Sequence, residues 1–143
     1  MPKMIFVSLP VADVARATAF YEAIGFEKDP MFSGDHASSM KWSDAIVVML
    51  ADRAFFATLT TKPVIDPREG SSVLLALSRD SRAEVDAITE AALAAGGRTV
   101  HEPEDEGFIY SRAFEDLDGH GWGPVWMDVA AFEAKMQPQT ASA

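Results

Sequence analysis

The same order of predicted elements occurs twice along this chain: an apolar strand, an amphipathic helix and then a meander of short strands. In the first copy, the apolar run 4–11 leads to Asp13, whose carboxylate can cap a helix by accepting from free backbone N–H groups. In the second copy, the run 72–77 leads to Ser81, and Glu84 follows three residues later in a capping box. A recurring plan of this length predicts two copies of one structural unit.

The two copies align with Phe6 of the first strand opposite Leu74 of the second, 68 positions later. Each helix carries apolar residues at helical spacing on one face, which is typical of a helix that covers a sheet. These residues are Val14, Ala17, Tyr21 and Ile24 in the first copy, and Val85, Ile88, Ala92 and Ala95 in the second. The chain therefore predicts a fold of strands and helices built as two similar halves.

We expect one domain over residues 1–128, made of the modules 4–52 and 72–128 with the linker 53–71 between them. The linker has no clear period and is the least regular part of the domain. Residues 129–143 begin with a short apolar face and end in polar residues, so we expect a C-terminal helix followed by a frayed tail.

The composition disfavours several classes of function. The net charge of −10 argues against binding to nucleic acid or to an anionic membrane surface, since like charges repel. The chain has no cysteine, which rules out disulfides, thiolate metal sites and a cysteine nucleophile. No apolar run approaches the roughly 20 residues that a membrane helix needs, and no secretory segment precedes the first strand. We therefore expect a cytoplasmic protein with neither nucleic acid nor a membrane as its partner.

Two motifs narrow the fold further. Residues 116–123 (Asp-Leu-Asp-Gly-His-Gly-Trp-Gly) lie between two strand-like runs, and the Asp-Gly pair inside them is a strong hairpin signal. Residues 20–26 (Phe-Tyr-Glu-Ala-Ile-Gly-Phe) end the first helix. Together they resemble the Asp-Pro-Asp-Gly-His/Asn and Phe-Tyr-x-x-Leu-Gly-Phe patterns of the vicinal oxygen chelate superfamily, which contains glyoxalase I, bleomycin and fosfomycin resistance proteins and extradiol dioxygenases. The resemblance covers roughly residues 4–128.

The resemblance implies an α+β fold of two βαβββ modules that curl into a half-barrel cleft, and a homodimer, since members of this superfamily usually pair. It also implies a divalent metal held by strand residues in the cleft. The ligand positions map onto Phe6, Leu74 (or Val73 in the other register) and Gly123. These side chains supply no lone pair for a metal. The chain thus resembles a member that lacks the usual metal ligands.

The three histidines do not suggest a different metal site. His36, His101 and His120 all fall in predicted loops or turns. Asp116 and Asp118 are close to His120 in sequence, but hydrogen bonding within a turn is the ordinary role of such residues. We expect no metal cofactor, and the alternative is one divalent metal in the cleft.

Strand alternation predicts which side chains line the cleft. The lining is expected to be mostly apolar with two hydroxyl groups, and aromatic side chains are expected at an edge. These residues are Phe6, Ser8, Leu74, Ala76, Ser111, Ala113 and Gly123, with Tyr110 or Trp42 at the edge. No serine has an obvious histidine and acid partner, so a nucleophilic triad is unsupported.

These features favour a metal-free protein that binds a small, mostly apolar molecule without converting it. The first alternative is a divalent-metal-dependent lyase or dioxygenase, in which a metal polarises vicinal oxygens and a carboxylate moves a proton. The second is a non-catalytic scaffold whose surface is functional. Because one fold hosts many chemistries, the sequence leaves open whether the chain is an enzyme.

Overall fold

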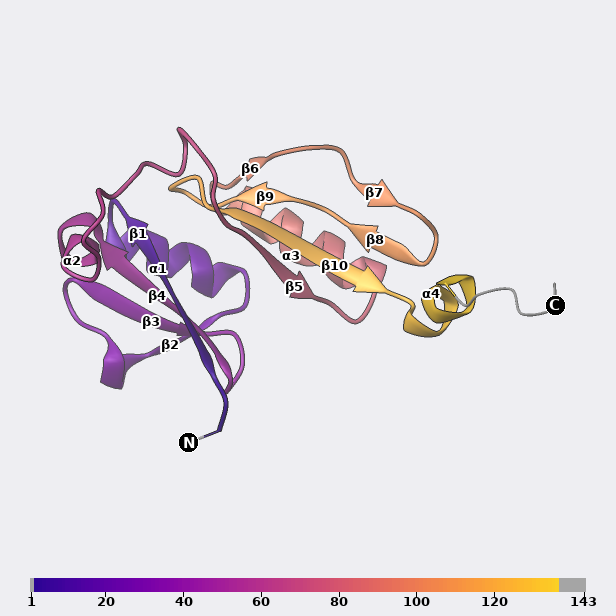
Figure 1. Ribbon diagram of the computed structural model, residues 1–143, viewed down its shortest axis with the longest axis horizontal. Coiled ribbons are helices and arrows are strands. Elements are labelled where there is room, and N and C mark those ends of the chain that lie inside the picture. Colours follow the sequence, from indigo (N-terminus) through magenta and orange to yellow (C-terminus); the bar gives the residue numbers. More distant parts are fainter. Residues whose placement is uncertain (1, 137–143) are drawn as a thin grey trace.

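The computed structural model describes residues 2–136 and contains two β-sheets side by side, each covered on one face by a long helix (Figure 1). The first sheet has the strand order β1-β4-β3-β2. Its module consists of β1 (Ile5–Val11), α1 (Val14–Ala23), β2 (Glu27–Asp29), the 3-10 turn η1 (Pro30–Phe32), β3 (Ala37–Lys41) and β4 (Ile46–Asp52). β1 and β4 run parallel, whereas β3 is antiparallel to both of its neighbours.

The second sheet repeats this plan, because β5 runs parallel to β10 as β1 does to β4. Its module consists of β5 (Leu74–Ser78), α3 (Arg82–Ala94), β6 (Arg98–Thr99), β7 (Glu104–Asp105), β8 (Ile109–Ser111), β9 (Phe114–Glu115) and β10 (Gly121–Met127). β8 and β9 both pair antiparallel with β10, and each pairs at its outer edge with β7 or β6. The expected α+β fold of two βαβββ modules with a curled half-barrel sheet is confirmed.

Both long helices begin at the residues that the sequence indicates. Asp13 accepts a hydrogen bond from the N–H of Arg16 at 3.0 Å, and Ser81 accepts one from the N–H of Glu84 at 3.1 Å. These bonds satisfy donors that the first turn of a helix leaves free. A glycine with positive φ follows each helix: Gly25 and Gly96. The left-handed backbone there is accessible to glycine at little cost, so each helix ends where the chain must turn back to the sheet.

Alternation along the strands gives each sheet a helix side and an open side. On β1, Leu9 and Val11 are buried on the helix side, whereas Phe6 on the open side is 54% exposed. On β5, Leu77 is buried and Leu74 is 78% exposed. Apolar strand residues on the open side are therefore available for contact with another molecule.

One hydrophobic core joins the two modules on the helix side of the sheets. Tyr21 of α1 packs edge-on against Trp122 of β10, with the ring centroids 5.8 Å apart. Phe20 of the same helix contacts Phe114 of β9 across the modules, with the ring centroids 6.3 Å apart. The interior of each module is thus completed by side chains from the other.

The segment between the modules forms α2 (Arg53–Ala57) and then a long loop. α2 contacts both β1 and β4, and the loop after it passes along β1. Val47 and Ala51 of β4 share the open side with Phe6 but are only 4% and 0% exposed. The segment between the modules therefore covers part of the open side of the first sheet.

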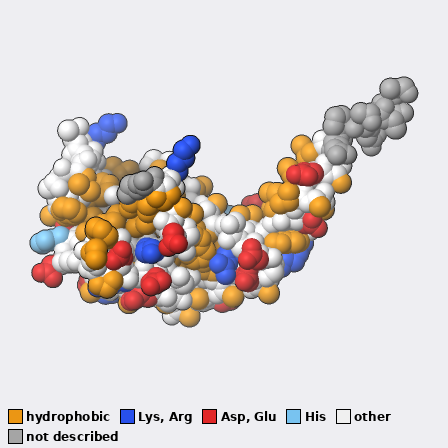
Figure 2. Space-filling model, turned by 90° about the horizontal axis from the view of Figure 1, so that it is seen from below, with side chains coloured by type: hydrophobic (Ala, Val, Ile, Leu, Met, Phe, Trp, Pro, Cys, Tyr) orange, Lys and Arg blue, Asp and Glu red, His pale blue; other side chains and the backbone are white. Residues whose placement is uncertain are grey.

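A last helix, α4 (Val129–Met136), projects from the end of the second module as an arm (Figures 1 and 2). Phe132 holds it against Phe108, with the ring centroids 5.5 Å apart, and the Lys135 ammonium lies 4.7 Å from the Phe108 ring centroid. None of its residues is buried. The tail expected to be frayed, 137–143, lies outside the described residues. Within residues 2–136, no helix has both the length and the apolar character needed to cross a bilayer.

Candidate functional site

A hollow of about 390 Å³ lies on the open side of the second sheet. Neighbouring strands form its floor in register: Gly123 of β10 lies beside Ala76 of β5, and Val125 of β10 lies opposite Ser111 of β8. The structure gathers five of the nine predicted cleft residues around this hollow: Leu74, Ala76, Ser111, Ala113 and Gly123. Their part in binding a ligand stays a prediction.

The rim of this hollow carries two polar side chains, His101 and Glu104. His101 Nδ1 lies 3.9 Å from the Glu104 carboxylate and 2.8 Å from the carbonyl oxygen of Glu102. A carbonyl oxygen only accepts hydrogen bonds, so His101 Nδ1 carries the proton in this arrangement. The side chains of His101 and Glu104 are 46% and 70% exposed, so water screens the pair strongly. The hollow thus combines an apolar floor with one hydroxyl and a solvated polar rim.

Gly121 and Gly123 of β10 both lie in the floor, but they differ in the space that a side chain would have. A Cβ at Gly121 would lie 2.8 Å from Cδ2 of Leu74. A Cβ at Gly123 would meet nothing closer than the carbonyl oxygen of Arg112, at 3.7 Å. The missing side chain at Gly123 therefore leaves space in the floor that another group can occupy.

The residues present do not fit the divalent metal that the resemblance implies. Phe6, Leu74 and Gly123 occupy the mapped ligand positions, and Val73 is the alternative to Leu74; none carries a lone-pair donor. Within the described part of the chain, no three His, Asp or Glu side chains are grouped closely enough to hold a metal ion. A zinc site in a protein needs several nitrogen or oxygen donors at about 2.0–2.2 Å.

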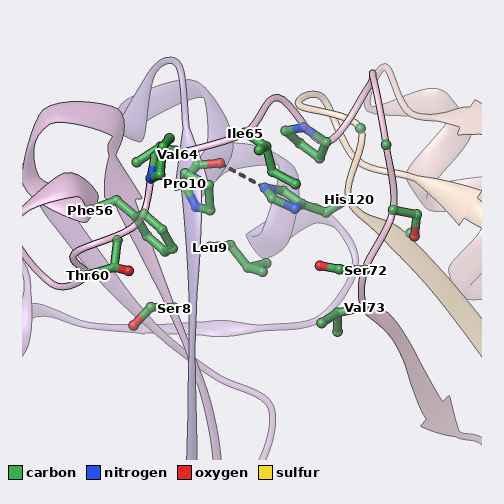
Figure 3. A pocket seen from close by; sticks show the side chains of 16 residues that line it. Ser8, Leu9, Pro10, Phe56, Thr60, Val64, Ile65, Ser72, Val73 and His120 are labelled. Carbon is green, nitrogen blue, oxygen red and sulfur yellow. Dashed lines mark hydrogen bonds between the residues drawn. The ribbon is translucent and has the colours of Figure 1, made fainter.

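A second hollow, of about 270 Å³, lies along β1 (Figure 3). The residues around it come from β1, from the segment between the modules and from the closing hairpin, and include Ser8, Pro10, Phe56, Ile65 and His120. Gly121 borders both hollows, so the two are neighbours. The single cleft expected from the sequence is thus divided: Ser8 lines the second hollow, and Phe6 lines neither.

Two residues expected at the edge of the cleft lie on the helix side of the sheets instead. Trp42 packs against Phe26 in the core, with the ring centroids 5.0 Å apart. Tyr110 donates its hydroxyl to Asp86 of α3 at 2.6 Å. Neighbouring residues of a strand face opposite sides, so Tyr110 cannot share the open side with Ser111. The expectation for Trp42 and Tyr110 is corrected accordingly.

The closing hairpin holds buried polar groups that link the modules. Asp116 is 2% exposed, and one of its oxygens accepts from three backbone N–H groups, those of residues 118–120, each at 2.9 Å. Its other oxygen accepts from the hydroxyl of Tyr21, which in turn accepts from Trp122 Nε1 at 2.9 Å. Burial, and after it the charge of Asp116, raises the pKa of Tyr21 well above its ordinary value. The Tyr21 hydroxyl therefore stays protonated and able to donate.

Two further contacts run from this hairpin to the first module. Asp118 accepts from the N–H of Ala12 at 2.8 Å, and His120 Nε2 lies 2.8 Å from the carbonyl oxygen of Pro10. Burial raises the pKa of Asp118. The turn role expected for Asp116 and Asp118 agrees with these bonds, but the motif also joins the modules, which the sequence did not indicate.

The sequence does not place the side chains of the segment between the modules at the second hollow, although Phe56 was a candidate for a lid, a dimer contact or packing. Phe56 and Ile65 belong to no periodic pattern that relates them to β1. The one available signal was the pair Pro63 and Pro67, since prolines restrict a loop and favour a fixed path. The two prolines indicate an ordered loop, but they do not indicate that the loop packs along β1.

The comparisons with known proteins agree with this architecture. A sequence model of the Glyoxalase/Bleomycin resistance protein/Dioxygenase superfamily matches residues 3–123. Similar solved structures include a hypothetical protein from S. aureus, with 26% identity, a TM-score of 0.74 and coverage of 88% of this chain and 95% of that one. No curated protein matches the chain.

Two more distant structures show the same fold. One is a glyoxalase/bleomycin resistance protein/dioxygenase family enzyme from Burkholderia phytofirmans PsJN, with 15% identity, a TM-score of 0.74 and coverage of 87% of this chain and 98% of that one. The other is the fosfomycin resistance protein FosX from Listeria monocytogenes, with 19% identity, a TM-score of 0.66 and coverage of 91% and 97%. At these identities the likeness concerns the fold alone.

Proposed function

The chain belongs to the Glyoxalase/Bleomycin resistance protein/Dioxygenase superfamily, and from this membership we propose that it binds a small, mostly apolar molecule in the hollow of the second sheet. Binding takes place without a metal and without conversion of the ligand. One observation carries the proposal: apolar side chains and a glycine stand at the positions where the family resemblance places metal ligands. Apolar side chains at these positions favour the binding of an apolar ligand, and they provide no lone-pair donor for a metal.

The exposure of Leu74 supports this reading. Its side chain is 78% exposed on a regular strand, and the neighbouring Val73 is 60% exposed, so two large apolar side chains in a row face solvent. Covering such surface contributes about 25 cal/mol for each Å² of apolar area removed from water. A ligand that lies across Leu74, Ala76 and the open floor at Gly123 gains this contribution directly.

The charge distribution around the hollow favours a neutral ligand. Arg112 is the one lining residue with a permanent positive charge. Its guanidinium points to α3, where it pairs with Asp86 at 3.2 Å and with Glu90 at 2.9 Å. A ligand carboxylate in the hollow would lose water without gaining a cationic partner, which is costly. The Ser111 hydroxyl can serve one hydrogen-bonding group of an otherwise apolar ligand.

We extend the proposal to a homodimer. Large apolar side chains are exposed at several places on the open sides and at the ends of the described chain, and Figure 2 shows such side chains over much of one face. They include Ile5, Phe6, Val73, Leu74, Val100, Met127 and Val129. Contiguous apolar patches on a protein surface commonly mark an interaction site. Light scattering after size-exclusion chromatography measures the mass in solution, and a monomer at micromolar concentration would contradict this part of the proposal.

A ligand screen by thermal shift tests the binding proposal. Neutral aromatic compounds should raise Tm, since a ligand at 100 times its Kd adds about 2.7 kcal/mol of stability. Leu74→Glu should abolish the shift, whereas Met31→Glu, a matched change at an 82% exposed residue outside the hollow, should keep it. Light scattering on both variants separates loss of a ligand from loss of a dimer.

Metal analysis of the purified protein tests the second half of the proposal. About one Zn, Fe, Ni or Mn per chain, lost on substituting residues of the hollow, would support a metal-dependent lyase or dioxygenase instead. Turnover of glutathione conjugates on addition of such a metal would do the same. If no compound binds and the open faces of the sheets only contact another chain, the hypothesis of a non-catalytic scaffold is favoured.

A further inference from the structure

The second hollow differs in chemistry from the one assigned above. None of its lining residues is charged. Apolar walls come from Pro10 of β1 and from Phe56 and Ile65 of the segment between the modules (Figure 3). A cavity of about 270 Å³ is large enough for a single-ring organic molecule and lies just below the usual range of ligand pockets, about 300–1,000 Å³. The absence of charge among its walls excludes strongly ionic ligands, because nothing there would compensate their lost hydration.

His120 gives this hollow one directional polar group. Its Nε2 lies 2.8 Å from the carbonyl oxygen of Pro10, and a carbonyl oxygen can only accept. Nε2 therefore carries the hydrogen, and in the neutral imidazole the other nitrogen, Nδ1, has a free lone pair. Within residues 2–136, no hydrogen-bond donor lies within bonding distance of Nδ1. The contact with Pro10 thus fixes the tautomer and leaves an acceptor unused.

The position of the imidazole makes this acceptor relevant to the hollow. Figure 3 shows the ring between Ile65 on one side and Ser72 on the other, among the lining side chains. The hydroxyl of Ser72 can either donate or accept, so it does not select a ligand by itself. The imidazole acceptor does distinguish between ligands, because a ligand that carries an O–H or N–H donor gains a hydrogen bond to Nδ1.

We propose that the second hollow is a binding site for a neutral, single-ring apolar compound with a hydroxyl group, such as a phenol, whose O–H donates to His120 Nδ1. The ring of the ligand lies against Pro10, Phe56 and Ile65, and its hydroxyl donates to the imidazole. This site is separate from the hollow of the second sheet, although Gly121 borders both. It draws its walls from both modules, so an occupant also bridges the junction between them.

Phenol and its methyl ether, anisole, test the proposal as a matched pair of probes. They share the ring, but only phenol can donate a hydrogen bond. We expect phenol to bind roughly fivefold more tightly than anisole in titrations followed by NMR, the ratio that one ordinary hydrogen bond gives. The chain has three histidines, so the 15N signals of the imidazoles are few. Phenol should shift the Nδ1 signal of His120 and anisole should leave it nearly unchanged.

Two variants locate the effect. A Gln side chain at position 120 places its amide N–H near the position of Nε2, so His120→Gln can keep the bond to the Pro10 carbonyl while it removes Nδ1. In this variant the preference for phenol over anisole should disappear. Ile65→Trp, a change on an exposed loop side chain that makes no polar contact, should fill the hollow and weaken both probes. This second variant keeps the test informative if His120→Gln does not fold.

Four results on the unsubstituted chain would overturn the proposal. They are equal affinity of the two probes, an unshifted His120 signal, a proton on Nδ1 in the free protein, and no binding of either probe at millimolar concentration. Leu74→Glu distinguishes this site from the proposed function. If that variant abolishes phenol binding, phenol occupies the hollow of the second sheet; this inference then fails while the proposed function stands.

Discussion

Replacing Tyr21 with phenylalanine should destabilise the chain far more than the loss of one oxygen atom suggests. The Tyr21 hydroxyl is the single link between the Asp116 carboxylate and Trp122 Nε1. All three residues are buried, with 1%, 2% and 4% of their surfaces exposed. The phenylalanine ring fits the same space, so the substitution removes hydrogen bonds without leaving a large cavity.

The magnitude follows from what the substitution leaves behind. Trp122 loses the acceptor of its N–H, and an unsatisfied buried donor costs about 1–3 kcal/mol. Asp116 keeps its three backbone donors but loses the hydroxyl, and a hydrogen bond to a charged group contributes about 1.5–3 kcal/mol. We therefore expect a loss of about 3–5 kcal/mol in the free energy of unfolding. A loss of this size is a large part of the stability of a single domain.

Urea unfolding followed by tryptophan fluorescence measures this loss. Tyr110→Phe is the matched control, because Tyr110 also donates to an aspartate, Asp86, but is not buried and has a partly exposed partner. The control should lose at most about 1 kcal/mol. If Tyr21→Phe loses no more than Tyr110→Phe, the buried network does not hold the modules together and the reasoning is wrong.

Three further predictions concern the closing hairpin, the floor of the hollow and the first module. Gly123→Ala should cost no more than about 0.5 kcal/mol because the added Cβ has room. Gly119→Ala should cost about 1–3 kcal/mol because φ is +101° and its Cβ would lie 2.7 Å from a side-chain atom. Urea unfolding of both variants measures the difference. Burial raises the pKa of Asp118, so its contribution to stability is full below a pH of about 4 and is lost as pH rises through the raised pKa. Asp118→Asn should remove this decline in the free energy of unfolding with pH. Urea unfolding at several pH values measures it, and the same pH dependence in both chains would contradict the prediction. The hydrogen bond that His36 donates to the Asp52 carboxylate raises the pKa of His36. The Tm advantage over His36→Ala should therefore be full below pH ~6.5 and vanish as pH rises through the raised pKa.

The local parts of the fold could be predicted because their signals are local. Asp13 and Ser81 cap the two long helices as expected, since capping depends on residues within one turn. The open-side positions of Leu74 and Gly123 follow from a period of two along each strand. Within the described residues the histidines belong to no group of three metal-binding side chains, and the absence of a metal cofactor stays a prediction.

The site was predicted less well where it depends on contacts between distant segments. Trp42 and Tyr110 were expected at the cleft and lie on the helix side, because the core of the folded chain offers Phe26 and Asp86 as partners there. No sequence pattern indicated that α2 and the loop after it would lie along β1. The single expected cleft is divided into two hollows for this reason.

The sequence by itself determined the two-module plan, the helix ends and the lack of metal donors at Phe6, Leu74 and Gly123, because each of these is a property of residue type or of spacing along the chain. Only the tertiary structure decided that the closing hairpin reaches Ala12 and Pro10, and that His120 keeps a free acceptor beside a second hollow. The partners in these contacts lie more than 100 residues apart in the chain. Such contacts form only when burial of the shared core brings the modules together, and no local pattern records them.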